Sequence, residues 1–396
     1  MDTGRSTLTA TRERIIKGER GWWFLGPGGV ARLSAGHLTD TNALRPDAER
    51  YLREQGLFTA PAYRRYSLTV LTSTACNLGC GYCFQNTGQD TKTGFRPPRI
   101  RNRRLTPDTI EQVLAFTAEQ MARAGLDELV VMLFGGEPLL NPRGCLRLLQ
   151  RAADLNLHSA SMTSNGTLLT RPLVRQLADA GLRTVQITFD GDATTHDQIR
   201  VKRTGGATFD LIVDNIARVQ DVAPIRWYLR INVSEYNHHT IDALVERLAE
   251  RLDPARCALY LARVGDTGVG YRNDLLHSGE MLASFSRWQR RAVDLGFSVP
   301  RPRADVPCQA CSFRDGRYGA VVSADGTLSS CWETAGKPDK MVGTVSTGYL
   351  SGDLTADRWT SCEESYRYDD DFSTVLAFRD ALDASLLDYL SLTGRL

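Results

Sequence analysis

Residues 66–83 read Tyr66-Ser-Leu-Thr-Val-Leu-Thr72-Ser-Thr-Ala-Cys76-Asn-Leu-Gly-Cys80-Gly-Tyr-Cys83. The first part is rich in β-branched and aromatic side chains and predicts a strand. The second part carries cysteines in the spacing C-x3-C-x2-C. Thiolates on one short loop can hold three corners of a cubane iron–sulfur cluster and leave one iron open for a ligand that is not protein. Zinc is the poorer interpretation, because it prefers paired C-x2-C units with four protein ligands.

Outward from this loop, strand-like and helix-like segments alternate along the chain. We expect strands over 66–72, 128–134, 158–163, 184–189, 225–233 and 257–263. We expect helices from Thr106 onward and over 142–155, 172–180, 209–220, 239–252, 279–295 and 373–392. Near-continuous apolar strands separated by helices indicate an α/β fold with a parallel sheet and right-handed crossovers. Such a series fits a partial barrel or a doubly wound sheet, and in both the chemistry belongs at the C-terminal ends of the strands.

The composition excludes several classes of protein. The 396 residues carry 48 Lys+Arg against 46 Asp+Glu, so a net charge of +2 gives no global attraction to nucleic acid or to an anionic membrane. No apolar run approaches the roughly 18 residues of a membrane span, and the N-terminus lacks the apolar core of a secretory signal. We therefore expect a cytoplasmic protein. Nine cysteines in a long chain argue against a disulfide scaffold and for metal.

Further motifs follow the next three predicted strands in order. They are Gly135-Gly136-Glu137-Pro138, Thr163-Ser164-Asn165-Gly166, and Thr188-Phe189-Asp190-Gly191 with His196, Asp197 and Arg200. Together with the cysteine loop and the aromatic Tyr82 before its last cysteine, they resemble the radical S-adenosylmethionine (SAM) superfamily. The first of the three looks like that family's GGEP motif. The resemblance covers roughly residues 66–263 and implies a (β/α)6 partial TIM barrel.

The resemblance also implies a chemistry and a set of ligands. Cys76, Cys80 and Cys83 would hold a [4Fe-4S] cluster whose open iron chelates SAM. One electron would then cleave SAM to methionine and a 5′-deoxyadenosyl radical, which takes a hydrogen atom from the substrate. Glu137 can accept from the SAM ammonium, and Arg200 can pair with its carboxylate. The other candidates for cofactor binding are Tyr82, Gly135, Gly136, Ser164, Asn165, Thr188, Asp190 and Asn232.

For two of these candidates a simpler interpretation stays open. Arg200 can belong to an ordinary surface ion pair, and Thr188 can be a strand hydroxyl without a ligand. The sequence singles out no catalytic acid, base or radical relay.

A second group of cysteines lies beyond the barrel: Cys308, Cys311, Cys331 and Cys362. An Asp325-Gly326 hairpin turn is expected to bring Cys331 beside Cys308-x2-Cys311. The region resembles the auxiliary-cluster region of SPASM and twitch extensions, with fewer cysteines than a full SPASM domain, and implies one auxiliary [4Fe-4S] cluster. A four-cysteine zinc site is the alternative. Without Cys362, the auxiliary cluster would have an open iron. Cys145 and Cys257 are expected to be buried packing residues.

The stretch from His196 to Asp210 resembles SPASM-type enzymes that modify peptides and proteins. It implies a maturase that forms a crosslink, a thioether or an epimer in a ribosomally made precursor peptide, with a flavodoxin or ferredoxin as electron donor. Alternatives are a relative of the anaerobic sulfatase-maturing enzymes and a radical SAM dehydrogenase or mutase acting on a small metabolite. A non-enzymatic electron carrier or zinc scaffold is disfavoured, because a carrier has no use for a SAM pocket.

The expected domains are a cap or peptide-binding segment over 1–65, the radical SAM core over 66–298, an auxiliary-cluster domain over 299–372 and a C-terminal helix over 373–396. A basic run follows the cysteine loop. It comprises Arg96, Arg99, Arg101, Arg103 and Arg104. This run can hold an acidic leader peptide, or it is simply a solvated insertion.

Overall fold

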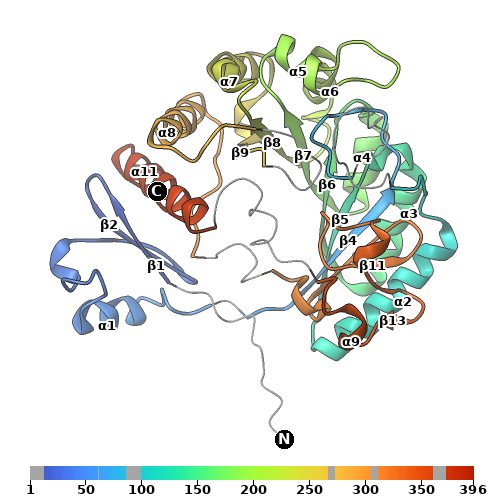
Figure 1. Ribbon diagram of the computed structural model, residues 1–396, viewed down its shortest axis with the longest axis horizontal. Helices are drawn as coiled ribbons and strands as arrows, with labels where there is room; N and C mark the ends of the chain where they lie inside the picture. The colour runs from blue at the N-terminus through green and yellow to red at the C-terminus, as the bar shows by residue number, and fades with distance from the viewer. Residues whose placement is uncertain (1–12, 61, 86–99, 266–272, 305–310, 360–371) are drawn as a thin grey trace, which may run out of the picture.

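A computed structural model describes residues 13–60, 62–85, 100–265, 273–304, 311–359 and 372–396. One sheet dominates it, with the strand order β13-β12-β11-β10-β4-β5-β6-β7-β8-β9. From β4 to β9 every neighbouring pair is parallel. The strands form an arc whose outer side is covered by helices (Figure 1). The predicted α/β partial barrel is confirmed.

The barrel strands and helices agree closely with the predicted ranges, except that the short helix α5 was not predicted. The strands are β4 (Arg65–Ser73), β5 (Glu128–Gly135), β6 (Leu157–Ser164), β7 (Leu182–Phe189), β8 (Arg226–Val233) and β9 (Cys257–Arg263). The helices are α2 (Pro107–Ala124), α3 (Pro142–Ala152), α4 (Arg171–Asp179), α5 (Ala193–Ile199), α6 (Phe209–Val219), α7 (Ile241–Arg251) and α8 (Gly279–Asp294). Helix α2 shows why the agreement is good. Thr106 caps its N-terminus, Pro107 follows, and Gly125 ends it with a φ of 66°.

The strands alternate more than the sequence analysis expected. In β8, the side chains of Trp227, Leu229 and Ile231 are fully buried in the main core. The residues between them, such as Tyr228 and Arg230, are only half-buried. A strand of a closed parallel sheet would be buried on both faces. Here the outer face packs against helices, and the inner face of the open barrel carries polar side chains.

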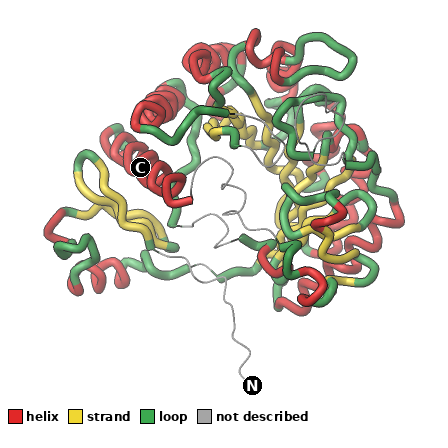
Figure 2. The backbone as a smooth tube through the Cα atoms, in the orientation of Figure 1, coloured by secondary structure: helices red, strands yellow, loops and turns green. Residues whose placement is uncertain are grey.

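The cysteine-rich region after the barrel extends the same sheet. Strands β10 (Gly319–Val322), β11 (Thr327–Ser329), β12 (Met341–Thr344) and β13 (Gly348–Tyr349) follow in sequence, with the short helix α9 (Gly352–Thr355) after them. The predicted hairpin is present, and its Gly326 has a φ of 85°. Strand β10 runs parallel to β4, with Gly319 opposite Ser67 and Val322 opposite Val70. The region therefore adds strands at the β4 edge of the barrel (Figure 2).

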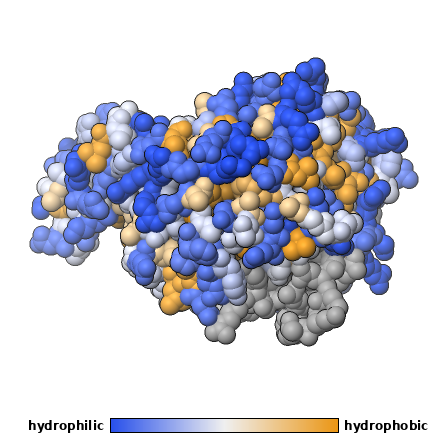
Figure 3. Space-filling model, turned by 90° about the horizontal axis from the view of Figure 1, so that it is seen from above, coloured by the Kyte–Doolittle hydropathy of each residue, from blue (hydrophilic) through white to orange (hydrophobic). Residues whose placement is uncertain are grey.

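The N-terminal segment forms a small antiparallel sheet that the sequence analysis did not predict. Its strands are β1 (Arg14–Gly18), β2 (Gly21–Gly26) and β3 (Gly29–Leu33), and α1 (Pro46–Glu54) follows. This module packs on the C-terminal helix α11 (Phe372–Leu392), where Trp23 donates from Nε1 to Asp388 at 2.8 Å. The module lies at the left of Figures 1 and 3, and the face in Figure 3 is mostly hydrophilic. No described helix is both long and apolar enough to cross a membrane.

Candidate active site

The first cysteine loop begins at the C-terminal end of β4, as predicted. Cys76, Cys80 and Cys83 are half-buried on this loop. The N–H of Leu78 donates to the Cys76 sulfur at 3.4 Å. Burial raises the pKa of Cys76 to about 11 and that of Cys80 to about 12. Thiols with such pKa values lose their protons when a metal binds. Among the described residues no group of His, Cys, Asp or Glu side chains is arranged to hold a single metal ion.

The two glycines of the GGEP motif support the start of this loop. A side chain on Gly135 would place its Cβ 2.1 Å from the Ser73 carbonyl oxygen, and one on Gly136 would lie 2.4 Å from that of Ala75. The Gly136 N–H donates to Ser73 at 2.9 Å. Gly136 is a predicted SAM contact, and in the structure its N–H is bonded to the chain itself. The glycines are needed because the backbone of residues 73–75 lies directly on them.

Glu137 joins the ends of β5 and β6. Its buried carboxylate accepts from the Asn165 N–H at 2.7 Å, from the Ser164 hydroxyl at 2.9 Å and from the Leu139 N–H at 3.0 Å. Burial raises the pKa of Glu137, and these donors act against that rise. The carboxylate is therefore engaged by its own chain, and its contact with the SAM ammonium stays a prediction.

Asn165 connects the third motif to the cysteine loop. Its side-chain amide donates to the Asn77 amide oxygen at 2.7 Å and lies 3.7 Å from the Cys76 sulfur. Asn77 in turn donates to the Thr167 hydroxyl at 2.9 Å. The sequence analysis did not single out Asn77 or Thr167. A donor close to a cluster sulfur is the kind of contact that tunes an iron–sulfur site.

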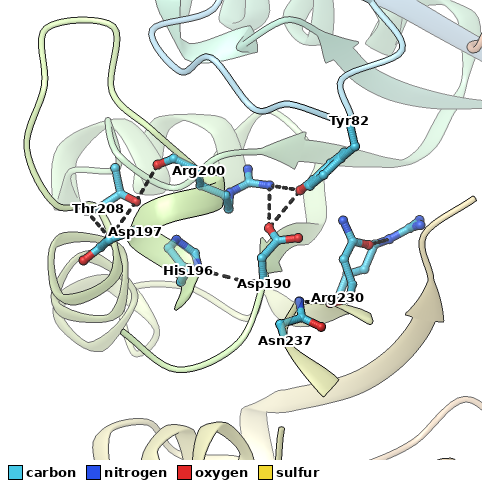
Figure 4. A network of polar contacts seen from close by, with 9 residues as sticks. Tyr82, Asp190, His196, Asp197, Arg200, Thr208, Arg230 and Asn237 are labelled. Carbon is cyan, nitrogen blue, oxygen red and sulfur yellow. Dashed lines mark hydrogen bonds and ion pairs between the residues drawn. The ribbon is translucent and has the colours of Figure 1, made fainter. Parts of the chain in front are cut away.

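Tyr82, Asp190 and Arg200 form one buried polar cluster (Figure 4). The Tyr82 hydroxyl donates to Asp190 at 2.8 Å and accepts from Arg200 at 2.7 Å, while Arg200 and Asp190 lie 3.4 Å apart. Burial raises the pKa of Asp190, and Arg200 is the strongest influence in the opposite direction. Arg200 is thus in a buried pair and not a surface one. Its Nε is buried without a hydrogen-bond partner in the described structure.

The residues around Arg200 hold it in place. His196 is buried and its pKa is lowered well below the usual value, so its neutral ring can accept from the Asp190 N–H at 3.3 Å. Asp197 accepts from the Thr208 N–H at 2.6 Å, just before α6. The Thr208 hydroxyl donates to the Arg200 carbonyl oxygen at 3.0 Å. His196 and Asp197 of the His-Asp-x-x-Arg motif therefore help to hold Asp190 and Arg200 in position.

Thr188 and Asn232 lie at the same end of β7 and β8. Thr188 is opposite Arg230 in the sheet. The Asn232 side-chain oxygen accepts from Arg230 Nε at 2.7 Å, and its carbonyl oxygen accepts from Asn237 at 2.8 Å. Arg230 is not among the predicted site residues, although the alternation of β8 places it on the same face as Asn232.

The second cysteine group is described only in part. Cys311 and Cys331 lie near each other on either side of β10 and β11, and burial raises the pKa of Cys331 to about 12, with a smaller rise from Cys311. Phe313 packs edge-on against Trp332, with ring centroids 6.0 Å apart. Cys308 and Cys362 lie outside the described residues. Cys145 and Cys257 are fully buried, as predicted.

Comparison with known proteins identifies the family. The Radical SAM superfamily profile matches residues 70–248. GTP 3′,8-cyclase of Acidothermus cellulolyticus is 32% identical over 264 residues, which is 65% of this chain and 67% of that enzyme. The sporulation killing factor maturation protein SkfB of Bacillus subtilis is 26% identical over 225 residues, 55% of this chain and 49% of that protein. A loop that can hold an iron–sulfur cluster at the mouth of a partial barrel agrees with these matches, and the chain belongs to the radical SAM superfamily.

A solved structure supports the fold. Native anSMEcpe with bound AdoMet superposes with a TM-score of 0.59 at 13% identity, covering 83% of this chain and 100% of that one. The protein is therefore a radical SAM enzyme, and its family uses SAM and a [4Fe-4S] cluster. When bound, the cluster and SAM supply the 5′-deoxyadenosyl radical.

The residues present fit both groups. Cys76, Cys80 and Cys83 supply thiolates from one loop, and the unpartnered Nε of Arg200 is a buried donor suited to an anionic group. The motif residues fix the loop from three sides, through Gly136, Asn165 and the Tyr82 hydroxyl.

Proposed function

We propose that this enzyme uses its radical chemistry to modify a ribosomally synthesised precursor peptide, forming a crosslink, a thioether or an epimer. The observation that carries the proposal is the likeness to SkfB, whose name describes the maturation of a sporulation killing factor. The N-terminal sheet is consistent with it. Strand β3 lies at the edge of that sheet, and an edge strand can pair with an extended peptide.

In this proposal Cys76, Cys80 and Cys83 hold the SAM-cleaving cluster, and Cys308, Cys311, Cys331 and Cys362 hold one auxiliary [4Fe-4S] cluster. Arg200, Asn165 and Glu137 contact SAM, while Asp190 positions Tyr82 and Arg200. The auxiliary cluster accepts or relays an electron near the peptide, and a flavodoxin or ferredoxin of the cytoplasm reduces the enzyme. The exposed Arg101, Arg103 and Arg104 are available to an acidic leader.

A second candidate is a nucleotide-modifying enzyme, favoured by the 32% identity to GTP 3′,8-cyclase. The two candidates are separated by anaerobic reconstitution followed by addition of SAM, dithionite and either GTP or any short peptide that a search of the neighbouring genes finds. The reaction is run in deuterated water and the peptide is analysed by mass spectrometry. A crosslink or thioether is seen as a loss of hydrogen, and an epimer as the exchange of a Cα hydrogen for deuterium. Modified peptide with untouched GTP supports the proposal, and conversion of GTP alone contradicts it.

The auxiliary cluster has its own test. A protein with two cubanes binds about eight irons per chain, and we expect Cys311→Ser to remove about four of them while 5′-deoxyadenosine is still formed. The matched variant Cys83→Ser is expected to abolish that formation. Bound zinc in place of the second set of irons would contradict the auxiliary cluster and leave the SAM-cleaving cluster intact.

A further inference from the structure

The geometry points to Arg230 as a binding site for a carboxylate group of the peptide substrate. This inference rests on the proposed function, because it names the chemistry that the peptide must bring into the barrel. Arg230 lies on the inner face of the barrel, beside residues assigned to the SAM end of the site.

The position of Arg230 follows from the pattern of β8. Trp227, Leu229 and Ile231 point to the helices and are fully buried, so the residues between them point to the inside of the arc. Arg230 is opposite Thr188 of β7 on one side and Tyr260 of β9 on the other. The Arg230 side chain is therefore two residues along the strand from Asn232, on the same face, and opposite Thr188.

The guanidinium of Arg230 is fixed but not neutralised. Its Nε donates to the Asn232 side chain at 2.7 Å, and neither terminal amino group has a hydrogen bond or ion pair to the described residues. Arg226, on the same face, shows the contrast, because its terminal amino groups donate to the Ala255 carbonyl oxygen and to the Ser298 hydroxyl. A guanidinium held at Nε presents its two terminal amino groups together, which suits a carboxylate that accepts in a fork.

Among the residues that the structure describes, no carboxylate forms an ion pair with Arg230. Asp190 follows the neighbouring strand β7, and its buried carboxylate is engaged by Tyr82 and Arg200. Tyr260, with 41% of its surface exposed, flanks the guanidinium, which lies 5.8 Å from the ring centroid. A half-buried cation between the Tyr260 ring and Thr188 is a site that an incoming anionic side chain completes.

Arg230 is distinct from the predicted SAM cation. Arg200 lies beside the cysteine loop, where its charge acts on the thiols of Cys76 and Cys80. Arg230 lies on the other side of Asp190 from Arg200 (Figure 4). The two arginines can therefore serve two anions, SAM at the loop and substrate deeper on the inner face.

The test uses the reconstituted enzyme with SAM and without reductant. Phenylglyoxal modifies arginine, and peptide mass spectrometry gives its rate at Arg230. The probes are N-acetyl-glutamate methylamide, N-acetyl-alanine, the neutral N-acetyl-glutamine methylamide and inorganic phosphate. A single charge-assisted pair binds with a dissociation constant of roughly 10–100 mM, so about 100 mM of a carboxylate probe is expected to slow modification about two- to tenfold. Arg175, exposed on α4, is the internal control.

The probes also separate the two sources of the carboxylate. Protection by the glutamate probe alone assigns an acidic side chain, and protection by N-acetyl-alanine alone assigns the C-terminus of the peptide. Equal protection by the neutral probe, protection by phosphate alone, or no protection would each overturn the inference. Because no peptide turnover is measured, a failure of the proposed function is seen separately, as an unmodified peptide.

A variant separates substrate from SAM as the anion. Arg230→Gln is expected to abolish carboxylate binding, measured by isothermal titration with the glutamate probe, and to leave the dissociation constant of SAM within about twofold. Arg226→Gln is the matched control on the same strand and should retain probe binding. A SAM dissociation constant raised tenfold or more in Arg230→Gln would assign Arg230 to SAM and overturn the proposal.

Discussion

The hydroxyl of Tyr82 donates to Asp190 and accepts from Arg200, so the residue between Cys80 and Cys83 is tied to the end of β7. The sequence motif calls for an aromatic residue at position 82, but it gives no reason for the hydroxyl group that tyrosine adds. In the structure the phenol links the cysteine loop to the cation expected to meet SAM. A contact that holds a ligand loop in place acts on the metal site through positioning.

Tyr82→Phe tests this link. Loss of a hydrogen bond to charged groups costs roughly 1.5–3 kcal/mol, so we expect the [4Fe-4S] cluster to be lost to a chelator about tenfold faster or more. Absorbance at the cluster band gives the rate. Tyr51→Phe is the control, because the side chain of Tyr51 is 61% exposed on α1. Equal rates in the two variants would show that the hydroxyl does not support the loop.

At the scale of elements, the GGEP segment is a platform for the cysteine loop. The Gly136 N–H and the Glu137 N–H donate to the carbonyl oxygens of Ser73 and Ala75 at 2.9 and 2.8 Å. The end of β5 is thereby bonded to the beginning of the loop that leaves β4. The spacing of the three cysteines in space depends on this close approach.

Gly136→Ala is expected to displace the loop. Its Cβ would lie 2.4 Å from the Ala75 oxygen, which is backbone and cannot move aside alone. Overpacking of this kind costs about 1–3 kcal/mol, and we expect reduced iron content after reconstitution together with a lower midpoint in urea. Gly279→Ala is the matched control, since Gly279 begins α8 with nothing within 4 Å of an added Cβ. The control should load iron normally.

The elements that the sequence predicted well have local signals. Thr106-Pro107 and Gly125 mark both ends of α2, and Asp325-Gly326 marks the hairpin of β10 and β11. The parallel pairing of β10 with β4 has no local signal, because it joins residues about 250 positions apart through contacts that only the folded chain makes. The strands β1 to β3 were missed because each has only five or six residues and glycines lie at their ends.

The candidate site also combines features that have a local sequence signal with features that have none. Motif spacing identified the residues at the strand ends, including Asn165, Asp190 and Arg200. It did not show that Arg200 is bonded to Tyr82, because that contact depends on how a loop and a helix end meet. Arg230 could have been predicted from the sequence. The alternation of Trp227, Leu229 and Ile231 marks the buried face of β8 and leaves Arg230 on the opposite face.

At the scale of the whole molecule, the two ends of the chain are joined. Residues of β1 and β2 pack on α11 in one apolar cluster that includes Ile16, Trp23 and Leu387. Asp388 is the polar centre of this contact. It is 5% exposed, and it accepts from Trp23 Nε1 at 2.8 Å and from the Glu19 N–H at 2.7 Å. The N-terminal sheet, with its open edge strand β3, is thus held on the outside of the barrel by the last helix.

Asp388→Ala is expected to release the N-terminal module without unfolding the barrel. It leaves the indole N–H of the buried Trp23 unpaired, at roughly 1–3 kcal/mol for an unsatisfied buried donor, and removes the acceptor of the Glu19 N–H. We expect faster trypsin cleavage between the module and β4, detected by mass spectrometry, while the cluster absorbance and SAM binding persist. Asp179→Ala, at an exposed position on α4, should change neither. Loss of cluster and module together would instead mean that the two ends fold as one cooperative unit, and a peptide docked on β3 would then be coupled directly to the barrel.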